Sequence, residues 1–282
     1  MGRFRIAERW PLLVFGLLLL FFLPVLLQPP RHRNGRQRSC ATNIRQVALG
    51  AVGYANERGE FPRGVLLDGL PPERGTSWIS QCLEFLYHED LEQAYDRSTP
   101  WDLPPNAEIA KTRIMILTCS AAETVTTAKG FPTTSYVGIA GVGADAATLE
   151  SGHPRAGIFG YSRVTKISDI RDGTSNTLLV AETDLDLGSW MSGGHSTIRA
   201  VVPAQRPYIG VGRPFGGPHK NGANVAFADG SVRFVSATIA PEMIEAMATI
   251  AGGEAVSEDG MSCPRMACIE GLALTGRVFS LG

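Results

Sequence analysis

The first strong pattern along the chain is an uncharged apolar run at residues 10–27, WPLLVFGLLLLFFLPVLL. A helix of this length spans roughly 27 Å, at about 1.5 Å per residue, which matches the apolar core of a bilayer. The run ends in Gln28-Pro29-Pro30-Arg31 rather than in small residues, so the pattern favours an uncleaved transmembrane anchor over a cleaved signal peptide. Arginines flank the run on both sides, so the positive-inside rule does not choose its orientation.

Beyond the run, the spacing predicts a helix from Ser39 to about Arg58, with Ser39 as its N-cap and Gly59 at its end. Its narrow, small-residue face suits packing on a sheet. A second helical stretch is predicted at 78–86. The residues that recur at three- and four-residue steps in the first helix are Cys40, Ile44, Val47, Ala48, Ala51 and Ala55.

Two buried strands are predicted, at 114–119 (IMILTC) and at 176–182 (NTLLVAE), and the glycine-rich segment 138–143 is expected to be a loop. Helices and strands follow one another without βαβ regularity. The fold class is therefore α+β.

A β-hairpin is predicted near the C-terminus, where 223–228 and 231–235 alternate apolar with small or polar residues around Asp229-Gly230. Asp229-Gly230 suits a type I′ turn, in which both residues have positive φ. A short helix is expected to begin near Pro241 and to close at Gly252, and the tail from Gly253 is expected to be irregular. The hairpin is expected to place four apolar residues in cross-strand register near the turn, with one face of the hairpin on the first helix: Val225, Phe227, Val232 and Phe234. The short helix is expected to bury Met243, Ile244, Met247 and Ile250.

Four motifs occur in a recognisable order over roughly residues 39–252. The last is His219, nine intervening residues and Asp229-Gly230, an H-x9-D-G signature. In these motifs the chain resembles the prepilin-type, processing-associated H-x9-D-G domain family, pilin-like or pseudopilin-like extracytoplasmic proteins of planctomycete-type bacteria with no assigned biochemical role. The chain lacks the family's leader, because Gly16 is followed by four leucines and no Glu stands at the fifth position. The motifs are CATNIRQVALGAVGYANERGEFP (40–62), SWISQCLEFLYHEDLEQAYD (77–96), ISDIRDGTSNTLLVAE (167–182) and FGGPHKNGANVAFADGSVRFVS (215–236).

The resemblance implies a transmembrane helix followed by a pilin-like spine helix, packed on a mostly antiparallel sheet with long loops. It also implies a disulfide between Cys40 and Cys119, because both positions match cysteines common in the family. The expected segments are a basic N-terminus (1–9), the anchor (10–27), a Pro/Arg-rich linker (28–38), the pilin-like H-x9-D-G domain (39–252) and the tail (253–282).

Charge and cysteine content narrow the function classes. Seven arginines precede residue 39 together with Glu8 alone, so residues 39–282 carry 19 basic and 26 acidic side chains. This acidic body excludes a polybasic nucleic-acid binder. Cys263 and Cys268 form either a small disulfide loop or two thiols, since a zinc knuckle needs four ligands. Cys82 fits a small buried hydrophobic residue.

The chain contains no G-x-S-x-G, Walker A or H-E-x-x-H motif, and no G-x-G-x-x-G after a strand. His219 could pair with Asp229 or ligate a metal, but local roles are favoured: Asp229 in its turn, and His219 bonding the backbone of its own loop. His195 is a lone loop histidine. A low-ranked calcium candidate remains, because one face of an extended strand would carry Glu182, Asp184 and Asp186, although an exposed acidic strand edge is favoured.

Two function hypotheses follow. The favoured one is a single-pass membrane protein with an extracytoplasmic, pilin-like body that is structural or interacts with partners, without enzymatic activity or cofactor. Its partners would be the membrane, through residues 10–27, and other pilin-like, secretion-system or cell-envelope proteins. The alternative is an anchored hydrolase or carbohydrate-processing enzyme that uses a carboxylate pair, such as Asp184 with Asp229 across a cleft. Two close, buried carboxylates in a deep pocket would favour the enzyme.

Overall fold

The computed structural model describes residues 32–123, 125–253, 255–256 and 262–263. The anchor predicted at residues 10–27 and the cysteine at position 268 lie outside these ranges. Among the described residues, no helix combines the length and the apolar character needed to cross a bilayer. The chain divides into two units, Met1–Arg38 and Ser39–Gly282, and the sheet and the site belong to the second.

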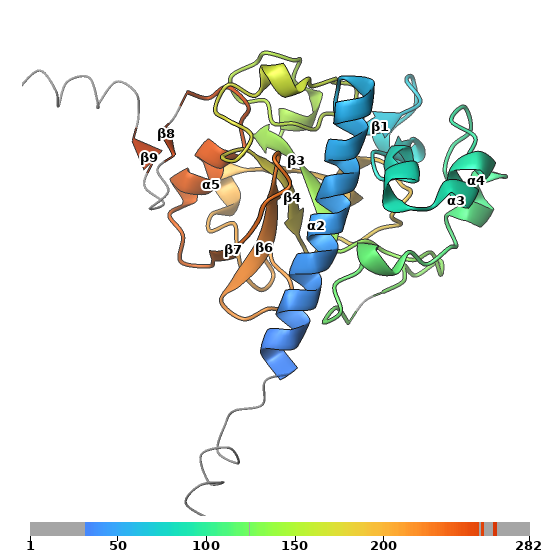
Figure 1. The fold of residues 1–282 in the computed structure, drawn as a ribbon, viewed down its shortest axis with the longest axis horizontal. Coiled ribbons are helices and arrows are strands. Elements are labelled where there is room, and N and C mark those ends of the chain that lie inside the picture. Colours follow the sequence, from blue (N-terminus) through green and yellow to red (C-terminus); the bar gives the residue numbers. More distant parts are fainter. Residues whose placement is uncertain (1–31, 124, 254, 257–261, 264–282) are drawn as a thin grey trace, which may run out of the picture. The chain divides into compact units, whose positions relative to one another are not determined.

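The centre of the second unit is a five-stranded sheet (Figure 1). Only β3 and β5 pair in parallel, and the other three pairings are antiparallel. The prediction of an α+β fold with a mostly antiparallel sheet is therefore confirmed. The strand order is β5 (Ile198–Val201), β3 (Tyr136–Val142), β4 (Leu178–Glu182), β6 (Gly222–Phe227) and β7 (Val232–Ser236).

Helix α2 (His32–Arg58) packs on one face of this sheet (Figure 1). The predicted small-residue face is buried there, against Tyr136, Val180 and Ala226 of the strands. The predicted end is also correct, because Gly59 follows with φ +81°. The predicted start is wrong: the helix begins at His32, so Ser39 is not its cap, and it includes part of the expected linker. No proline lies between His32 and Arg58 to interrupt it.

A second apolar cluster covers the opposite face of the sheet. Helix α5 (Pro241–Met247) contributes Ile244 and Met247, which pack with Val225 and Phe227 of β6. The predicted short helix is thus confirmed, although it ends at Met247 rather than at Gly252. Because both faces of the sheet are covered, β4 and β6 are buried along their whole length.

The predicted hairpin is present as β6 and β7, but its turn differs from the prediction. Only Gly230 has positive φ, at +80°, and its N–H donates to the Phe227 carbonyl over 2.9 Å. The loop is therefore a three-residue turn with a left-handed glycine rather than type I′. This loop length sets the register Ala226↔Val232, so Val232 faces the helix α2 side while Val225 and Phe227 face α5.

Gly230→Ala is expected to lower the free energy of unfolding by about 1–2 kcal/mol, because the Cβ of alanine makes a left-handed backbone conformation unfavourable. The added Cβ would also lie 2.7 Å from Cδ2 of Leu49, a half-exposed side chain that can move. Asp229→Asn is the matched control, with an expected change below about 0.5 kcal/mol, because its amide oxygen can still accept the Ser231 N–H that Asp229 accepts over 2.8 Å. Urea denaturation of both variants tests this, and equal losses would contradict the assignment of the left-handed position to Gly230 alone.

Three further sequence predictions are wrong. The glycine-rich segment 138–143, expected as a loop, lies largely in β3, where glycine lets neighbouring chain approach: a Cβ on Gly138 would lie 2.5 Å from the Phe159 ring. The strand expected at 114–119 contains the 3-10 helix η5 (Met115–Leu117). Ile114, just before this helix, and Leu117, at its end, are buried three residues apart, while Met115 is exposed. The helix expected at 78–86 is two 3-10 turns, η3 (Ser80–Cys82) and η4 (Glu84–Leu86).

The remaining described elements are short and surround the sheet. The tail predicted as irregular contains one antiparallel pair, β8 with β9. These elements are β1 (Val65–Leu66), β2 (Thr76–Ser77), α3 (Glu89–Ala94), α4 (Asn106–Ile109), β8 (Ala255–Val256), β9 (Ser262–Cys263), and the 3-10 helices η2 (Pro72–Arg74), η6 (Ala146–Thr148), η7 (Ile167–Asp169), η8 (Gly194–Ser196) and η9 (Pro203–Gln205).

Candidate functional site

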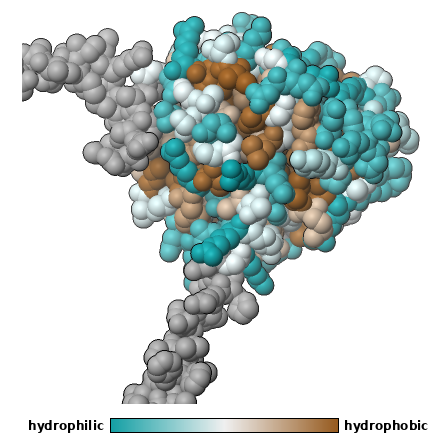
Figure 2. Space-filling view, viewed as in Figure 1, coloured by the Kyte–Doolittle hydropathy of each residue, from teal (hydrophilic) through white to brown (hydrophobic). Residues whose placement is uncertain are grey.

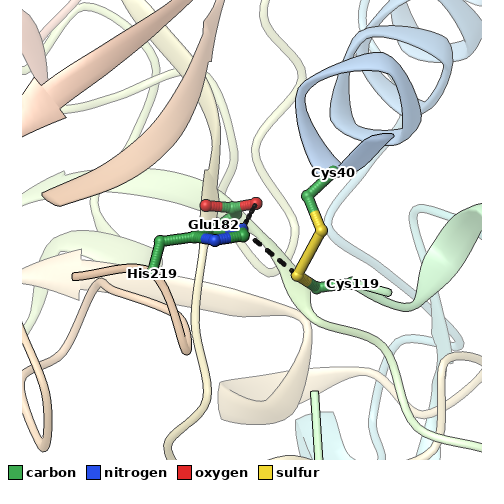
Figure 3. Close-up of side chains that lie close together, drawn as sticks. All are labelled: Cys40, Cys119, Glu182 and His219. Carbon is green, nitrogen blue, oxygen red and sulfur yellow. Dashed lines mark hydrogen bonds and ion pairs between the residues drawn. A yellow bond between two sulfur atoms is a disulfide. The ribbon is translucent and has the colours of Figure 1, made fainter. Parts of the chain in front are cut away.

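A disulfide joins helix α2 to the segment that follows η5 (Figure 3). Cys40 lies on the buried face of α2, and Cys119 lies two residues beyond Leu117. Their Cα atoms are 5.1 Å apart, within the limit of about 7 Å for a bridge. The pairing that the family resemblance implied is therefore the pairing in the structure.

Glu182, the last residue of β4, points into the interior beside this disulfide (Figure 3). Its side chain is 1% exposed, and its carboxylate accepts two hydrogen bonds from Asn224, from the backbone N–H over 2.7 Å and from Nδ2 over 3.0 Å. Asn224 lies on β6, next to β4 in the sheet. A carboxylate this deeply buried is stable only with such partners.

The three carboxylates considered as a low-ranked calcium candidate at the end of β4 do not share one strand face. The strand ends at Glu182, so the alternation that would align Asp184 and Asp186 with it also ends there. Asp184 and Asp186 are exposed, and Asp186 lies 3.6 Å from Nε2 of His195. Burial, followed by the nearby Arg199 charge, lowers the pKa of His195.

Arg199 fixes the chain just past Glu182. Its buried guanidinium donates to Thr183 Oγ1 over 2.6 Å, to the Pro214 carbonyl over 2.7 Å and to the Leu185 carbonyl over 2.9 Å. Burial lowers the pKa of Arg199 to about 10, so it stays charged near neutral pH. These contacts hold the end of β4 in place while the chain turns outward.

His219 reaches the same place from the loop before β6 (Figure 3). Its side chain is 6% exposed, and Nε2 lies 3.4 Å from the Cys119 Sγ and 3.6 Å from Glu182 Oε1. The loop is held beside β4 by the Gly216 N–H, which donates to the Glu182 carbonyl over 2.9 Å. The expectation that His219 bonds its own loop is therefore wrong, because its contacts are with β4 and the disulfide.

These four side chains form one buried cluster from four separate parts of the chain. One potential ligand atom from each of Cys40, Cys119, Glu182 and His219 lies within 4.8 Å of the others. From the sequence, only Cys40 and Cys119 are paired, through the family resemblance. Sequence spacing groups Glu182 with Asp184 and Asp186, and His219 with Asp229. The H-x9-D-G spacing carries no signal for this cluster, since Asp229 lies at the other end of β6.

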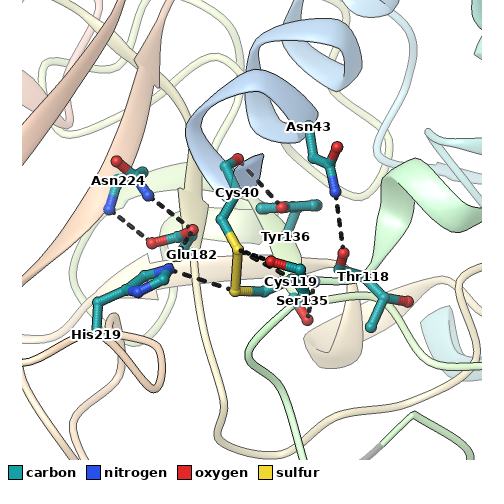
Figure 4. Close-up of a disulfide and its surroundings, with 10 residues drawn as sticks. Cys40, Asn43, Thr118, Cys119, Ser135, Tyr136, Glu182, His219 and Asn224 are labelled. Carbon is teal, nitrogen blue, oxygen red and sulfur yellow. Dashed lines mark hydrogen bonds and ion pairs between the residues drawn. A yellow bond between two sulfur atoms is a disulfide. The ribbon is translucent and has the colours of Figure 1, made fainter. Parts of the chain in front are cut away.

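Hydrogen bonds hold the surroundings of the cluster in place (Figure 4). Tyr136 donates from its hydroxyl to the Cys40 carbonyl over 3.3 Å, and the Cys119 N–H donates to Ser135 Oγ over 3.0 Å. Burial, with the Glu182 charge, raises the pKa of Tyr136 well above its usual value, so its hydroxyl remains a donor. The Ser120 N–H donates to the Cys40 Sγ over 3.2 Å. Both sulfur-bearing residues are thus anchored through their backbone as well as through the disulfide.

The family follows from a comparison with family models. The model described as "Protein of unknown function (DUF1559)", SBP_bac_10, matches residues 31–207. The chain belongs to this family. No curated protein and no solved structure matches the chain.

The DUF1559 match includes three members of the cluster and ends before the fourth, His219. It covers α2, β3, β4 and β5, and it stops before the β6–β7 hairpin that carries the H-x9-D-G signature. The resemblance to pilin-like H-x9-D-G proteins therefore stays a prediction, separate from membership in DUF1559.

The carboxylate pair of the enzyme hypothesis does not come together in this DUF1559 chain. Asp229 lies beside the start of β4, where its N–H donates to the Thr174 carbonyl over 3.2 Å, whereas Asp184 follows the end of that strand. Both side chains are exposed. The described residues therefore give no support to this pair as a glycosidase site, which needs carboxyls within about 10 Å.

Glu182→Gln is expected to lower the free energy of unfolding by about 1–3 kcal/mol. The amide keeps the shape of Glu182 but replaces one acceptor oxygen with a donor that faces the donors of Asn224. Asp184→Asn, an exposed neighbour two residues on, is the control, with an expected change within about 0.5 kcal/mol. Chemical denaturation measures both, and a neutral Glu182→Gln would contradict the assigned role of the carboxylate as a buried acceptor.

Proposed function

We propose that this DUF1559 chain is a single-pass, membrane-anchored, pilin-like protein with a structural or interaction role, and that its body lies outside the cytoplasm. The observation that carries the proposal is the buried Cys40–Cys119 disulfide, because disulfides persist in oxidising compartments and are rare in the cytosol. The apolar run at residues 10–27 supplies the anchor.

The arrangement of α2 supports the pilin-like part of the proposal. A long helix lies with its small-residue face along a mostly antiparallel sheet, and the disulfide fastens it near its N-terminal half. The β6–β7 hairpin next to β4 then acts as a folding element, in which Gly230 makes the turn and His219 reaches the buried cluster.

The surface beside α2 supports the interaction role. A cavity of about 800 Å³ lies between α2 and the segments 84–88 and 113–116. Exposed apolar side chains surround it, among them Tyr87 at 87%, Met115 and Leu49, and such exposure is typical of surfaces that contact partners. Figure 2 shows hydrophobic patches set among hydrophilic ones on the face that carries α2. The partners expected are other pilin-like, secretion-system or cell-envelope proteins.

Membrane fractionation followed by protease protection tests this proposal. The full-length chain is expected in the membrane pellet, released by detergent but not by high salt, and its body should be digested when protease is added to spheroplasts. A cytoplasmic marker should survive the same treatment. The variant Leu18→Arg/Leu20→Arg, which places two charges in the apolar run, is expected to shift the chain to the soluble fraction. A wild-type chain that is soluble without detergent, or a body protected in spheroplasts, would overturn the proposal.

A further inference from the structure

The buried cluster offers a ligand set that suits a transition metal once the disulfide is open. Two cysteines, one histidine and one carboxylate are the side chains that bind Zn²⁺ in tetrahedral sites. In such a site neighbouring ligand atoms lie about 3.3–3.8 Å apart, given bonds of about 2.0–2.3 Å. The distances from His219 Nε2 to the Cys119 Sγ, 3.4 Å, and to Glu182 Oε1, 3.6 Å, already fall in this range.

We propose that the reduced chain binds one Zn²⁺ ion between Cys40, Cys119, Glu182 and His219, and that disulfide formation releases it. A dithiol reductant transfers two electrons and two protons to the disulfide, which gives two thiols. The two thiols lose their protons when Zn²⁺ binds, and Nε2 of His219 and a Glu182 oxygen complete four ligands. In the reverse direction, a protein disulfide accepts two electrons from the two zinc-bound thiolates and two protons from water and becomes two thiols, the Cys40–Cys119 bond forms, and the ion leaves.

Opening the disulfide moves the sulfurs toward the geometry of a metal site. Two sulfurs that are no longer bonded separate to van der Waals contact, which is close to the S···S edge of about 3.8 Å in a tetrahedral zinc site. Cys40 and Cys119 are fixed through their own backbones by Tyr136 and Ser135, so this separation needs only rotation of the two side chains. The ligands from β4 and the loop before β6 remain in place.

Hydrogen bonds from neighbouring groups already orient two of the ligands. The Ser120 N–H points at the Cys40 Sγ over 3.2 Å, a contact that stabilises thiolate. Asn224 holds the Glu182 carboxylate through both of its oxygens. A cavity of about 300 Å³, lined by Asn43, Cys119 and Ser120 among others, reaches one of the four ligands, Cys119.

The donor set selects zinc rather than the calcium considered for the end of β4. Calcium takes six to eight oxygen ligands, whereas two of the four donors here are sulfur, and the exposed Asp184 and Asp186 are not part of the cluster. Two thiolates with a buried imidazole suit a tetrahedral ion such as Zn²⁺, or Co²⁺ as its spectroscopic substitute.

The test uses the full-length chain in detergent, with Cys82, Cys263 and Cys268 replaced by alanine so that only the cluster thiols remain. After reduction with a phosphine and removal of the excess, Co²⁺ titration should give the visible absorption of tetrahedral cobalt and a thiolate charge-transfer band, at one ion per chain. Zn²⁺ should then displace the cobalt. The oxidised chain should show neither band.

Ligand variants distinguish the cluster from adventitious binding. His219→Ala and Glu182→Gln should weaken Zn²⁺ binding more than the about 10- to 100-fold seen on loss of an outer-shell partner, while His195→Ala, a histidine outside the cluster, should leave it unchanged. If the reduced chain unfolds, one equivalent of Zn²⁺ should restore its near-ultraviolet circular dichroism. A reduced chain that binds no metal, does not refold with Zn²⁺, or binds equally well without His219 would overturn the proposal. These outcomes leave the fractionation result, and thus the proposed function, unaffected.

Discussion

Reduction of the Cys40–Cys119 disulfide is expected to lower the free energy of unfolding by about 4–5 kcal/mol. The bond closes a loop of 79 residues in the sequence, and for a loop of this length the entropy removed from the unfolded chain corresponds to about 4.5 kcal/mol at 25 °C. The bridge also joins α2 to the segment that leads into β3, two parts of the chain that pack in one core cluster. Loss of the bond therefore affects the cooperative unit as a whole.

Urea denaturation with and without reductant measures this difference, and a chelator must be present so that zinc cannot offset the loss. The double variant Cys40→Ala/Cys119→Ala should lose a comparable amount in the absence of reductant. Cys82→Ala serves as the control, because Cys82 is a free, buried thiol whose pKa is raised by burial. This variant keeps the Cys40–Cys119 bridge, so reductant should still lower its free energy of unfolding. A reduced chain within about 1 kcal/mol of the oxidised one would contradict the stabilising role of the bridge.

Local periodicity predicted the elements whose burial follows from their own sequence. The small-residue face of α2, the strand ending at Glu182 and the helix after Pro241 all have regular spacing and are correct in kind. The sequence does not predict β3, because glycine-rich segments are typical of loops. In the structure, the missing side chain of Gly138 leaves room for the Phe159 ring, and that of Gly141 leaves room for the 155–157 backbone. The segment 114–119 was misassigned because its apolar run is too short to distinguish a strand from a 3-10 turn.

The site was only partly accessible from the sequence. Cys40 and Cys119 were paired through family resemblance, but the positions of Glu182 and His219 depend on strand pairing between β4 and β6 and on the Gly216–Glu182 hydrogen bond. Strand register is a long-range property that spacing within one segment does not encode. Alternation within the segment likewise does not place Glu182, Asp184 and Asp186 on one face, because β4 ends at Glu182, which is buried.

Gly141→Ala is expected to lower the free energy of unfolding by about 3 kcal/mol or more, because two costs coincide at this position. Gly141 lies in β3 with φ +114°, a conformation that alanine adopts only with strain. An added Cβ would also lie 2.1 Å from the carbonyl oxygen of Arg155 and 2.5 Å from the backbone nitrogen of Gly157. Both atoms belong to backbone that is hydrogen-bonded to β3: the Val142 N–H donates to the Arg155 carbonyl, and the Gly157 N–H donates to the Ala140 carbonyl. They therefore cannot move away as the end of a flexible side chain could.

Gly130→Ala is the matched control, since Gly130 also has positive φ, at +82°, but a Cβ there meets no atom within 4 Å. Gly130→Ala should lose only the about 1–2 kcal/mol that comes from the left-handed conformation. The difference in the free energy of unfolding between the two variants therefore measures the effect of the close approach of the 155–157 backbone to β3. Chemical denaturation of both gives this difference directly, and equal losses would mean that the backbone around Gly141 relaxes. Because Tyr136, at the other end of β3, donates to the Cys40 carbonyl, a Gly141→Ala chain that stays folded but shifts β3 should also make the disulfide easier to reduce.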